Sequence, residues 1–148
     1  MNPPLSSSQR AEAVRERMLH HDAFSKLLGL EVDEVGAGYC RLHFTVRPDL
    51  LNGFAALHGG VTFAAADSAF ALACNSHGRQ SVDLTATIDY LDAGKLGDVV
   101  TVEAREEDLK HKIGVYQVRA TNQHGTLLAL FKGTAYRTST DILSLPNP

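Results

Sequence analysis

The sequence predicts an α+β fold in which one long helix is covered by an antiparallel sheet. The segment from Gly60 to about His77 is rich in Ala and Phe on all sides, and a helix that is apolar all round belongs inside a protein. Two strand-like segments precede it and four follow in hairpin-like succession. This order differs from the strand–helix alternation of parallel α/β proteins. One curved antiparallel sheet is the economical way to bury such a helix.

The first 28 residues predict a loose tail followed by a helical segment. The tail covers residues 1–8, which are rich in Pro and Ser. One of its three serines can cap a helix that runs to about His20. Asp22 can cap a second, short helix that ends at Gly29. We therefore assign residues 9–28 to an N-terminal helical segment whose charges form a solvated face.

The remaining elements are predicted from alternation. Residues 39–46 alternate strictly between apolar and polar side chains, and Arg47-Pro48-Asp49 then interrupts the strand. A loop over residues 50–57 leads to the long helix. The six expected strands are 30–35, 39–46, 81–91, 98–108, 113–122 and 126–138.

Length, charge and cysteine content restrict the class of protein. The 148 residues indicate one domain, 1–148, with a core that needs no metal or disulfide. A net charge of −3 is not that of a nucleic-acid or membrane-surface binder. The N-terminus lacks the features of a signal peptide, and the longest apolar stretch is too short to span a bilayer. Cys40 and Cys74 lie in apolar stretches, so we expect buried free thiols and a cytoplasmic location.

Asp67 is out of place in the long helix. Its neighbours three and four residues away are Phe63, Ala64, Phe70 and Ala71, and an unpaired carboxylate among such residues is unfavourable. Three structural explanations are open: an ion pair with a distant Arg or Lys, a hydrogen bond to a backbone amide, or a helix rotated to expose the carboxylate. The fourth explanation is a catalytic carboxylate.

The residues before the helix favour catalysis. Gly59 lies at the expected N-terminus, where backbone amides are free and a missing side chain lets a carbonyl group approach. That is the arrangement of an oxyanion hole, and Asn52 in the preceding loop can hydrogen-bond a reacting group or water. Taken alone, Gly59-Gly60 is equally consistent with a plain turn into a helix. Together with Asp67 it supplies what acyl transfer needs, a carboxylate and an amide donor.

The spacing of these residues implies a dimer. Gly59 and Asp67 are eight residues apart, about 12 Å along one helix, so both cannot contact one carbonyl group. If both act, they come from two chains whose helices run antiparallel across a two-fold axis. The catalytic hypothesis therefore predicts an isologous dimer with two equivalent sites.

Several motifs resemble the phenylacetyl-CoA thioesterases of bacterial phenylacetate degradation. The motifs are LNG at 51–53, HGG at 58–60, ADSAFALACNS at 66–76, TIDYL at 87–91, GVYQV at 114–118 and ALFKG at 129–133. The likeness runs from about Phe24 to Thr138. The segment from HGG to Asp67 marks the wider hot-dog thioesterase superfamily, and its extension to residue 76 points to the phenylacetyl-CoA type.

This resemblance implies a fold and roles for individual residues. The fold is the hot-dog fold, whose dimers join their sheets edge to edge and commonly pair into tetramers. Asp67 is the implied nucleophile or general base, and the Gly59 amide binds the thioester carbonyl. Asn52 orients the substrate or the water, and His58 positions the thioester or its surroundings. Thr85 corresponds, more loosely, to a hydroxyl residue near the water.

The resemblance also implies the reaction, hydrolysis of acyl-CoA thioesters such as phenylacetyl-CoA or its ring-hydroxylated forms. CoA is then part of the substrate, and no cofactor is expected. Lys110 and Lys112 sit at a strand connection where related proteins bind the nucleotide end of CoA. The alternative is that they are solvated surface lysines.

Other functions remain open from the sequence. Seven histidines invite a metal site, but neither an HExxH motif nor a paired Cys motif is present, so we expect none. Hot-dog proteins include hydratases and dehydratases of acyl thioesters, and His58 with Asp67 can be interpreted in that way. A non-catalytic acyl-CoA-binding module is the third class, although binding alone does not require a buried acid.

Overall fold

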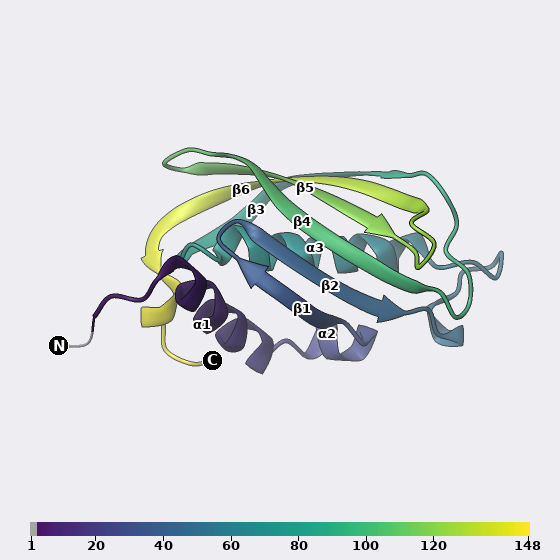
Figure 1. Cartoon of the computed structure of the whole chain (residues 1–148), viewed down its shortest axis with the longest axis horizontal. Helices are drawn as coiled ribbons and strands as arrows, with labels where there is room; N and C mark the ends of the chain where they lie inside the picture. Colours follow the sequence, from purple (N-terminus) through teal and green to yellow (C-terminus); the bar gives the residue numbers. More distant parts are fainter. Residues whose placement is uncertain (1–2) are drawn as a thin grey trace.

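A curved six-stranded sheet wraps around one long helix in the computed structural model, which describes residues 3–148 (Figure 1). The helices are α1 (Ser7–His20), α2 (Ala23–Leu28) and α3 (Gly59–Asn75), with 3-10 turns η1 (Pro48–Leu50) and η2 (Ile142–Ser144). The strands are β1 (Glu31–Gly36), β2 (Tyr39–Thr45), β3 (Arg79–Tyr90), β4 (Val99–Leu109), β5 (Ile113–Thr121) and β6 (Leu127–Asp141). The strand order is β1-β2-β4-β5-β6-β3, with every pair antiparallel. The predicted α+β arrangement is confirmed.

The two N-terminal helices begin at the expected caps. The Ser6 side chain accepts a hydrogen bond from the Gln9 amide and the Gln9 side chain returns one, which makes a complete capping box. Asp22 caps α2, and Gly29 ends it in the left-handed conformation with φ 73°. The predicted tail was too long, because residues 7 and 8 already belong to α1; its first two residues lie outside the described part of the chain.

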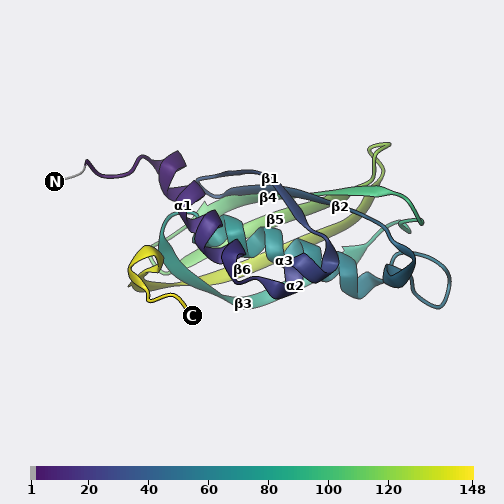
Figure 2. The same ribbon diagram turned by 90° about the horizontal axis from the view of Figure 1, so that it is seen from below.

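Helices α1 and α2 lie along the side of α3 that the sheet leaves uncovered (Figure 2). On the sheet side, the Phe70 ring of α3 packs against Tyr116 at 5.5 Å and Phe131 at 5.8 Å between ring centroids. Gly133 of β6 faces the same ring, and a Cβ there would lie 2.7 Å from Phe70. The absence of a side chain at this position lets the sheet approach the helix closely.

The long helix ends earlier than predicted, at Asn75 rather than near His77. The Asn75 side chain turns toward β3, where it accepts from the Ser81 amide at 2.8 Å and donates to the Ser81 carbonyl at 3.3 Å. The Ser76 hydroxyl donates to the Ala73 carbonyl at 2.7 Å. These side chains bind backbone groups that a longer helix would need, so β3 starts two residues before its predicted position.

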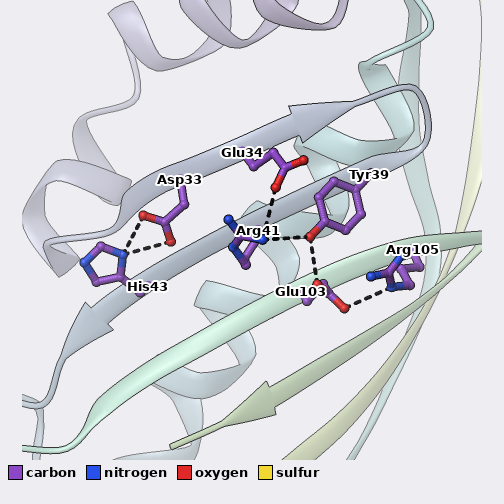
Figure 3. Close-up of polar contacts among 7 residues, drawn as sticks. All are labelled: Asp33, Glu34, Tyr39, Arg41, His43, Glu103 and Arg105. Atoms are coloured by element: carbon purple, nitrogen blue, oxygen red, sulfur yellow. Dashed lines mark hydrogen bonds and ion pairs between the residues drawn. The ribbon is translucent and has the colours of Figure 1, made fainter. Parts of the chain in front are cut away.

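A charged network covers the outer face of the first three strands in the sheet (Figure 3). The Tyr39 hydroxyl donates to Glu103 at 2.7 Å, Arg105 donates to the same carboxylate at 2.9 Å, and Arg41 pairs with an acid of β1 at 3.0 Å. The network joins Glu34, Tyr39, Arg41, Glu103 and Arg105, and beside it Asp33 and His43 form a separate pair at 2.9 Å. Alternate residues of β2 point inward and are fully buried, so this part of the sheet is polar outside and apolar inside.

Both cysteines are buried free thiols, as the sequence predicted. Burial raises the pKa of Cys40 and of Cys74 to about 12, so both remain protonated at neutral pH. Among residues 3–148, no helix is both long and apolar enough to cross a membrane.

Candidate active site

The N-terminus of α3 offers a backbone N–H group to a ligand. His58 is the N-cap, and its Nδ1 atom accepts from the Gly60 amide at 2.8 Å. The amides of Val61 and Thr62 donate to the His58 carbonyl. Within residues 3–148 the Gly59 amide donates to no acceptor. The Gly59 N–H is therefore available to a negatively charged or carbonyl oxygen.

Asn52 holds the loop that leads to this helix. Its Oδ1 atom accepts from the amides of Phe54 at 2.9 Å and Ala56 at 3.2 Å. This fixes the side chain by its carbonyl oxygen, while its Nδ2 group has no acceptor among the described residues. A pocket of about 410 Å³ lies here, and both Asn52 and Gly59 line it. Asn52 can thus donate to a molecule held near the Gly59 amide.

Tyr90, at the end of β3, forms the opposite wall of this pocket. Its hydroxyl donates to the Gly59 carbonyl at 3.1 Å. A Cβ on Gly59 would lie 3.2 Å from the Tyr90 ring, so a side chain at residue 59 would displace that ring. Tyr90 was not singled out from the sequence, although it stands within the TIDYL motif.

Asp67 lies further along α3 and is partly exposed in the single chain. Of the described residues, none forms an ion pair with its carboxylate, and none donates a backbone amide to it. The ion pair and the backbone hydrogen bond, two of the three structural explanations for Asp67, are therefore absent among these residues. Asp67 does not line the pocket at Gly59, as expected for residues about 12 Å apart on one helix.

A second carboxyl group, that of Asp83 on β3, lies near Asp67 and can hydrogen-bond with it. The register of β3 against β6 explains the position of Asp83. Asp83 is paired with Ala135, which is fully buried on the side of the sheet that faces α3. Cross-strand partners share a face of the sheet, so Asp83 points toward the helix. The sequence analysis did not select this residue.

A β-bulge separates Asp83 from Thr85, the residue that the resemblance implied. The register shifts between these two positions, so Leu84 is the extra residue. Thr85 pairs with Thr134, whose neighbour Gly133 faces Phe70 of α3. Thr85 therefore lies on the outer face of the sheet. In the single chain the structure brings Asp83, and not Thr85, to Asp67.

The surroundings of Asp83 favour its protonated form. Desolvation beside α3 is the largest cause, although Asp83 is exposed to solvent in the single chain. The charge of Asp67 and the hydrogen bond with it follow, and together these causes raise the pKa of Asp83 to about 6. Cys74 lies seven residues after Asp67 on the same helix, and both carboxylates contribute to the raised pKa of its thiol. These three groups form one cluster on the side of α3 that faces β3.

The two predicted CoA-binding lysines lie in the turn between β4 and β5. Lys110 pairs with Asp108 at 3.1 Å. Arg79, just after α3, donates to the His111 carbonyl at 2.9 Å, and Arg137 donates to the Lys110 carbonyl at 2.9 Å. In one chain this turn is therefore near the C-terminal end of α3, at the opposite end of the helix from Gly59.

The family model of the thioesterase superfamily matches residues 54–129, which contain the start of α3 and both carboxylates. The chain belongs to the thioesterase superfamily. A putative esterase of Archaeoglobus fulgidus is 37% identical over 90% of this chain and 87% of its own. The acyl-coenzyme A thioesterase PaaI of Escherichia coli K12 is 37% identical over 88% of this chain and 93% of its own.

Solved structures agree with this assignment. The structure of E. coli PaaI, from the phenylacetic acid degradation operon, matches with a TM-score of 0.90 and 36% identity, over 92% of this chain and 99% of that one. A hypothetical thioesterase of Streptococcus pneumoniae, solved with coenzyme A, matches with a TM-score of 0.78 and 30% identity, over 84% of this chain and 97% of that one. The thioesterase has the hot-dog fold, as the resemblance implied.

Among residues 3–148, no group of three or more His, Cys, Asp or Glu side chains is arranged to hold a metal ion. The expectation that the protein needs neither metal nor cofactor stays a prediction.

Proposed function

We propose that this thioesterase hydrolyses acyl-CoA thioesters, with phenylacetyl-CoA or its ring-hydroxylated forms as substrates, to the free acid and CoA. The observation that carries the proposal is that, within residues 3–148, the Asp67 carboxylate forms no ion pair and the Gly59 amide, at the start of the same helix, donates to no acceptor. The name of the E. coli relative, acyl-coenzyme A thioesterase, and the coenzyme A in the S. pneumoniae relative support this substrate class. The reaction is assigned to the cytoplasm, which suits a chain with two free cysteines.

The proposed site needs a second copy of the chain. Strand β3 pairs with β6 on one side, and its other edge is free within the described part of the chain. That edge exposes the large apolar side chains Val82, Leu84, Tyr90 and Leu91. An exposed apolar edge of this length favours pairing with another strand. Antiparallel pairing of two β3 strands across a two-fold axis makes a dimer, and two dimers make the proposed tetramer.

In this dimer, Gly59 of one chain and Asp67 of the other meet at one thioester carbonyl. Asp67 either attacks the carbonyl carbon, giving a mixed anhydride that water then hydrolyses, or removes a proton from the attacking water. In both routes the C–S bond breaks and CoA leaves as the thiolate. The Gly59 amide stabilises the negative charge that develops on the carbonyl oxygen. Asn52 orients the substrate or water, and His58 orders the first turn of the helix.

The same dimer explains a role for the basic turn. Two antiparallel α3 helices place the C-terminal end of one beside the N-terminal end of the other. Lys110 and Lys112 of one chain then lie toward the Gly59 pocket of the other, where their ammonium groups can bind the phosphates of CoA. In a single chain they are too far from Gly59 to do so, which is why the proposal depends on the dimer.

The test is thiol release from a panel of aryl, short-chain and long-chain acyl-CoA esters. We expect phenylacetyl-CoA and its hydroxylated forms to give the highest kcat/KM. Crotonyl-CoA distinguishes the hydratase alternative, because hydration removes the enoyl absorbance without releasing thiol. Hydration without thiol release, or tight acyl-CoA binding with neither reaction, would overturn the proposed hydrolysis.

A further inference from the structure

Tyr90 makes a contact with the long helix that the proposed mechanism does not use. Strand β3 alternates regularly after its bulge, so Tyr90 lies on the same face of the sheet as Ala86 and Ile88, which pack against the core. Its ring therefore meets the first turn of α3, where its hydroxyl donates to the Gly59 carbonyl at 3.1 Å. The end of β3 thus holds the residue whose free amide the proposed hydrolysis requires.

The hydrogen bonds around Gly59 hold two successive peptide units. In the unit that joins Gly59 to Gly60, the carbonyl oxygen accepts from Tyr90, and the N–H group donates to His58 Nδ1 at 2.8 Å. In the preceding unit, the His58 carbonyl accepts from two amides of the first turn at 2.9 and 3.3 Å. The N–H group of that preceding unit is the Gly59 amide, which donates to no acceptor within residues 3–148. Both carbonyl groups and the Gly60 amide are therefore fixed, and the Gly59 amide is left for a ligand.

Two glycines in succession make this turn intrinsically flexible. Glycine adopts more backbone conformations than any other residue and has a low helix propensity, so Gly59 and Gly60 alone define the direction of the free amide poorly. A side chain at residue 59 would stiffen the turn but displace the Tyr90 ring, because its Cβ would lie 3.2 Å from that ring. An oxyanion donor is most effective when its direction is fixed before the reaction. A contact from outside the helix has to supply this rigidity, and the Tyr90 hydroxyl makes such a contact.

We propose that Tyr90 is a positioning residue for the oxyanion-binding amide, an inference that rests on the hydrolysis proposed above. Its hydroxyl fixes the peptide unit between Gly59 and Gly60, and this sets the direction of the Gly59 N–H group toward the thioester carbonyl. The hydroxyl acts through the backbone, whereas the ring forms a wall of the 410 Å³ pocket. Loss of the hydroxyl alone should therefore slow the chemical step and leave substrate binding intact.

The kinetic test uses Tyr90→Phe, which keeps the ring and removes the hydroxyl. With phenylacetyl-CoA, kcat should fall about tenfold and KM should change less than twofold, because a misdirected amide loses stabilisation of the transition state and not of the bound substrate. Both proteins are compared at concentrations where sedimentation velocity shows the same assembly.

Tyr39→Phe is the matched control, because the Tyr39 hydroxyl donates to Glu103 at 2.7 Å on the outer face of the sheet. It removes the same atom away from the pocket and should leave kcat and KM unchanged. The proposal is overturned if Tyr90→Phe raises KM at normal kcat, changes neither constant, or loses activity only through dissociation.

Amide hydrogen exchange detects the fixed peptide unit without turnover. In protein labelled with ¹⁵N-glycine, the Gly60 amide should be protected in the wild type, although it lies in the first turn of a helix, where amides usually exchange rapidly. In Tyr90→Phe this protection should fall at least fivefold, and the Gly60 amide proton should move upfield. The reason is that a hydrogen bond at the carbonyl end of a peptide unit strengthens the one that its N–H group makes. The amide of Gly53, in the preceding loop, is the internal reference and should not change.

These measurements separate the inference from the proposed function. A protein that shows the Gly60 response but releases no thiol refutes the hydrolysis and keeps the anchored turn. A protein that hydrolyses phenylacetyl-CoA while Gly60 exchanges equally fast in wild type and Tyr90→Phe refutes the positioning role and keeps the hydrolysis. If Tyr90→Phe fails to fold, unprotected Gly60 in the wild type still overturns the proposal.

Discussion

The two edges of the sheet are built in opposite ways. The β1 edge has six residues and carries acids that pair with Arg41 and His43. The β3 edge has twelve residues and exposes apolar side chains. Short, charged edges resist pairing with other strands, whereas long apolar edges favour it.

This difference supports the proposed pairing of β3 with a second chain. Both carboxyl groups of the proposed site lie between α3 and β3, and Tyr90 at the end of β3 forms a wall of the Gly59 pocket. A partner that pairs with β3 would therefore cover and complete the site. The β1 edge contributes no residue to the pocket. Changes at the two edges should accordingly have very different consequences.

The largest effect is expected at the carboxylate itself. Asp67→Asn should lower kcat by about 10²–10⁴-fold, because the amide cannot act as base or nucleophile. The protein should stay folded, since Asp67 makes no ion pair with any described residue. Thiol release and far-UV circular dichroism measure the two effects. Asp33→Asn at the β1 edge is the control and should keep full activity; near-normal hydrolysis by Asp67→Asn would remove this residue from the mechanism.

The next largest effect concerns assembly. Val82→Lys places a charge on the exposed edge of β3 and should dissociate the dimer, lowering activity by tenfold or more at sub-micromolar protein. Sedimentation velocity and thiol release at the same concentrations test this. Glu31→Lys, which places the same side chain on the β1 edge and changes the charge by two units rather than one, should leave both unchanged. Dissociation by both variants, or by neither, would contradict the contrast between the edges.

A smaller effect is expected on the pH dependence of stability. The pKa of Asp83 is raised to about 6 in the folded chain, so the folded state binds this proton more tightly than the unfolded state does. The resulting stabilisation is complete below about pH 4 and is lost as the pH rises through about 6. Urea unfolding of Asp83→Asn across pH 4–7 should lack this decline. If the free energies of unfolding of wild type and variant differ by the same amount at every pH, Asp83 does not cause the decline.

The smallest effect is expected in the outer network. Arg41→Gln removes the 3.0 Å ion pair with Glu34, but both side chains are largely exposed, and such pairs contribute little. The free energy of unfolding should change by less than about 1 kcal/mol, and turnover should not change. Urea denaturation measures the first and thiol release the second. A loss of activity here would mean that the β1 edge has a role the structure does not explain.

The sequence was sufficient for most of the fold because its signals are local. Caps at Ser6 and Asp22, the glycine after α2 and the alternation of the strands each depend on neighbouring residues. The end of α3 was predicted two residues too late, because the Asn75 side chain binds Ser81 of the following strand. That contact depends on tertiary structure, and helix propensity does not contain it.

The candidate site was predicted only in part for the same reason. Gly59 and Asp67 stand out by type and spacing alone. Asp83 and Tyr90 do not, because their positions depend on the register of β3 against β6. A bulge reverses the alternation of a strand, so the pattern after Leu84 gives the wrong face for the residues before it. Thr85 was selected because the resemblance implied a hydroxyl residue there, and the register of β3 against β6 places it on the outer face of the sheet.

Subunit mixing tests the central claim, that one site uses Asp67 of one chain and Gly59 of another. Asp67→Asn and Gly59→Ala should each be nearly inactive, the latter because its new Cβ would lie 3.2 Å from the Tyr90 ring; Gly53→Ala, with open space around it, is the control. After the two inactive variants are unfolded together and refolded, half the dimers should be mixed, each with one intact site. Activity should recover to about a quarter of the wild-type value. If the mixture stays as inactive as its components, Asp67 and Gly59 do not act across the two chains.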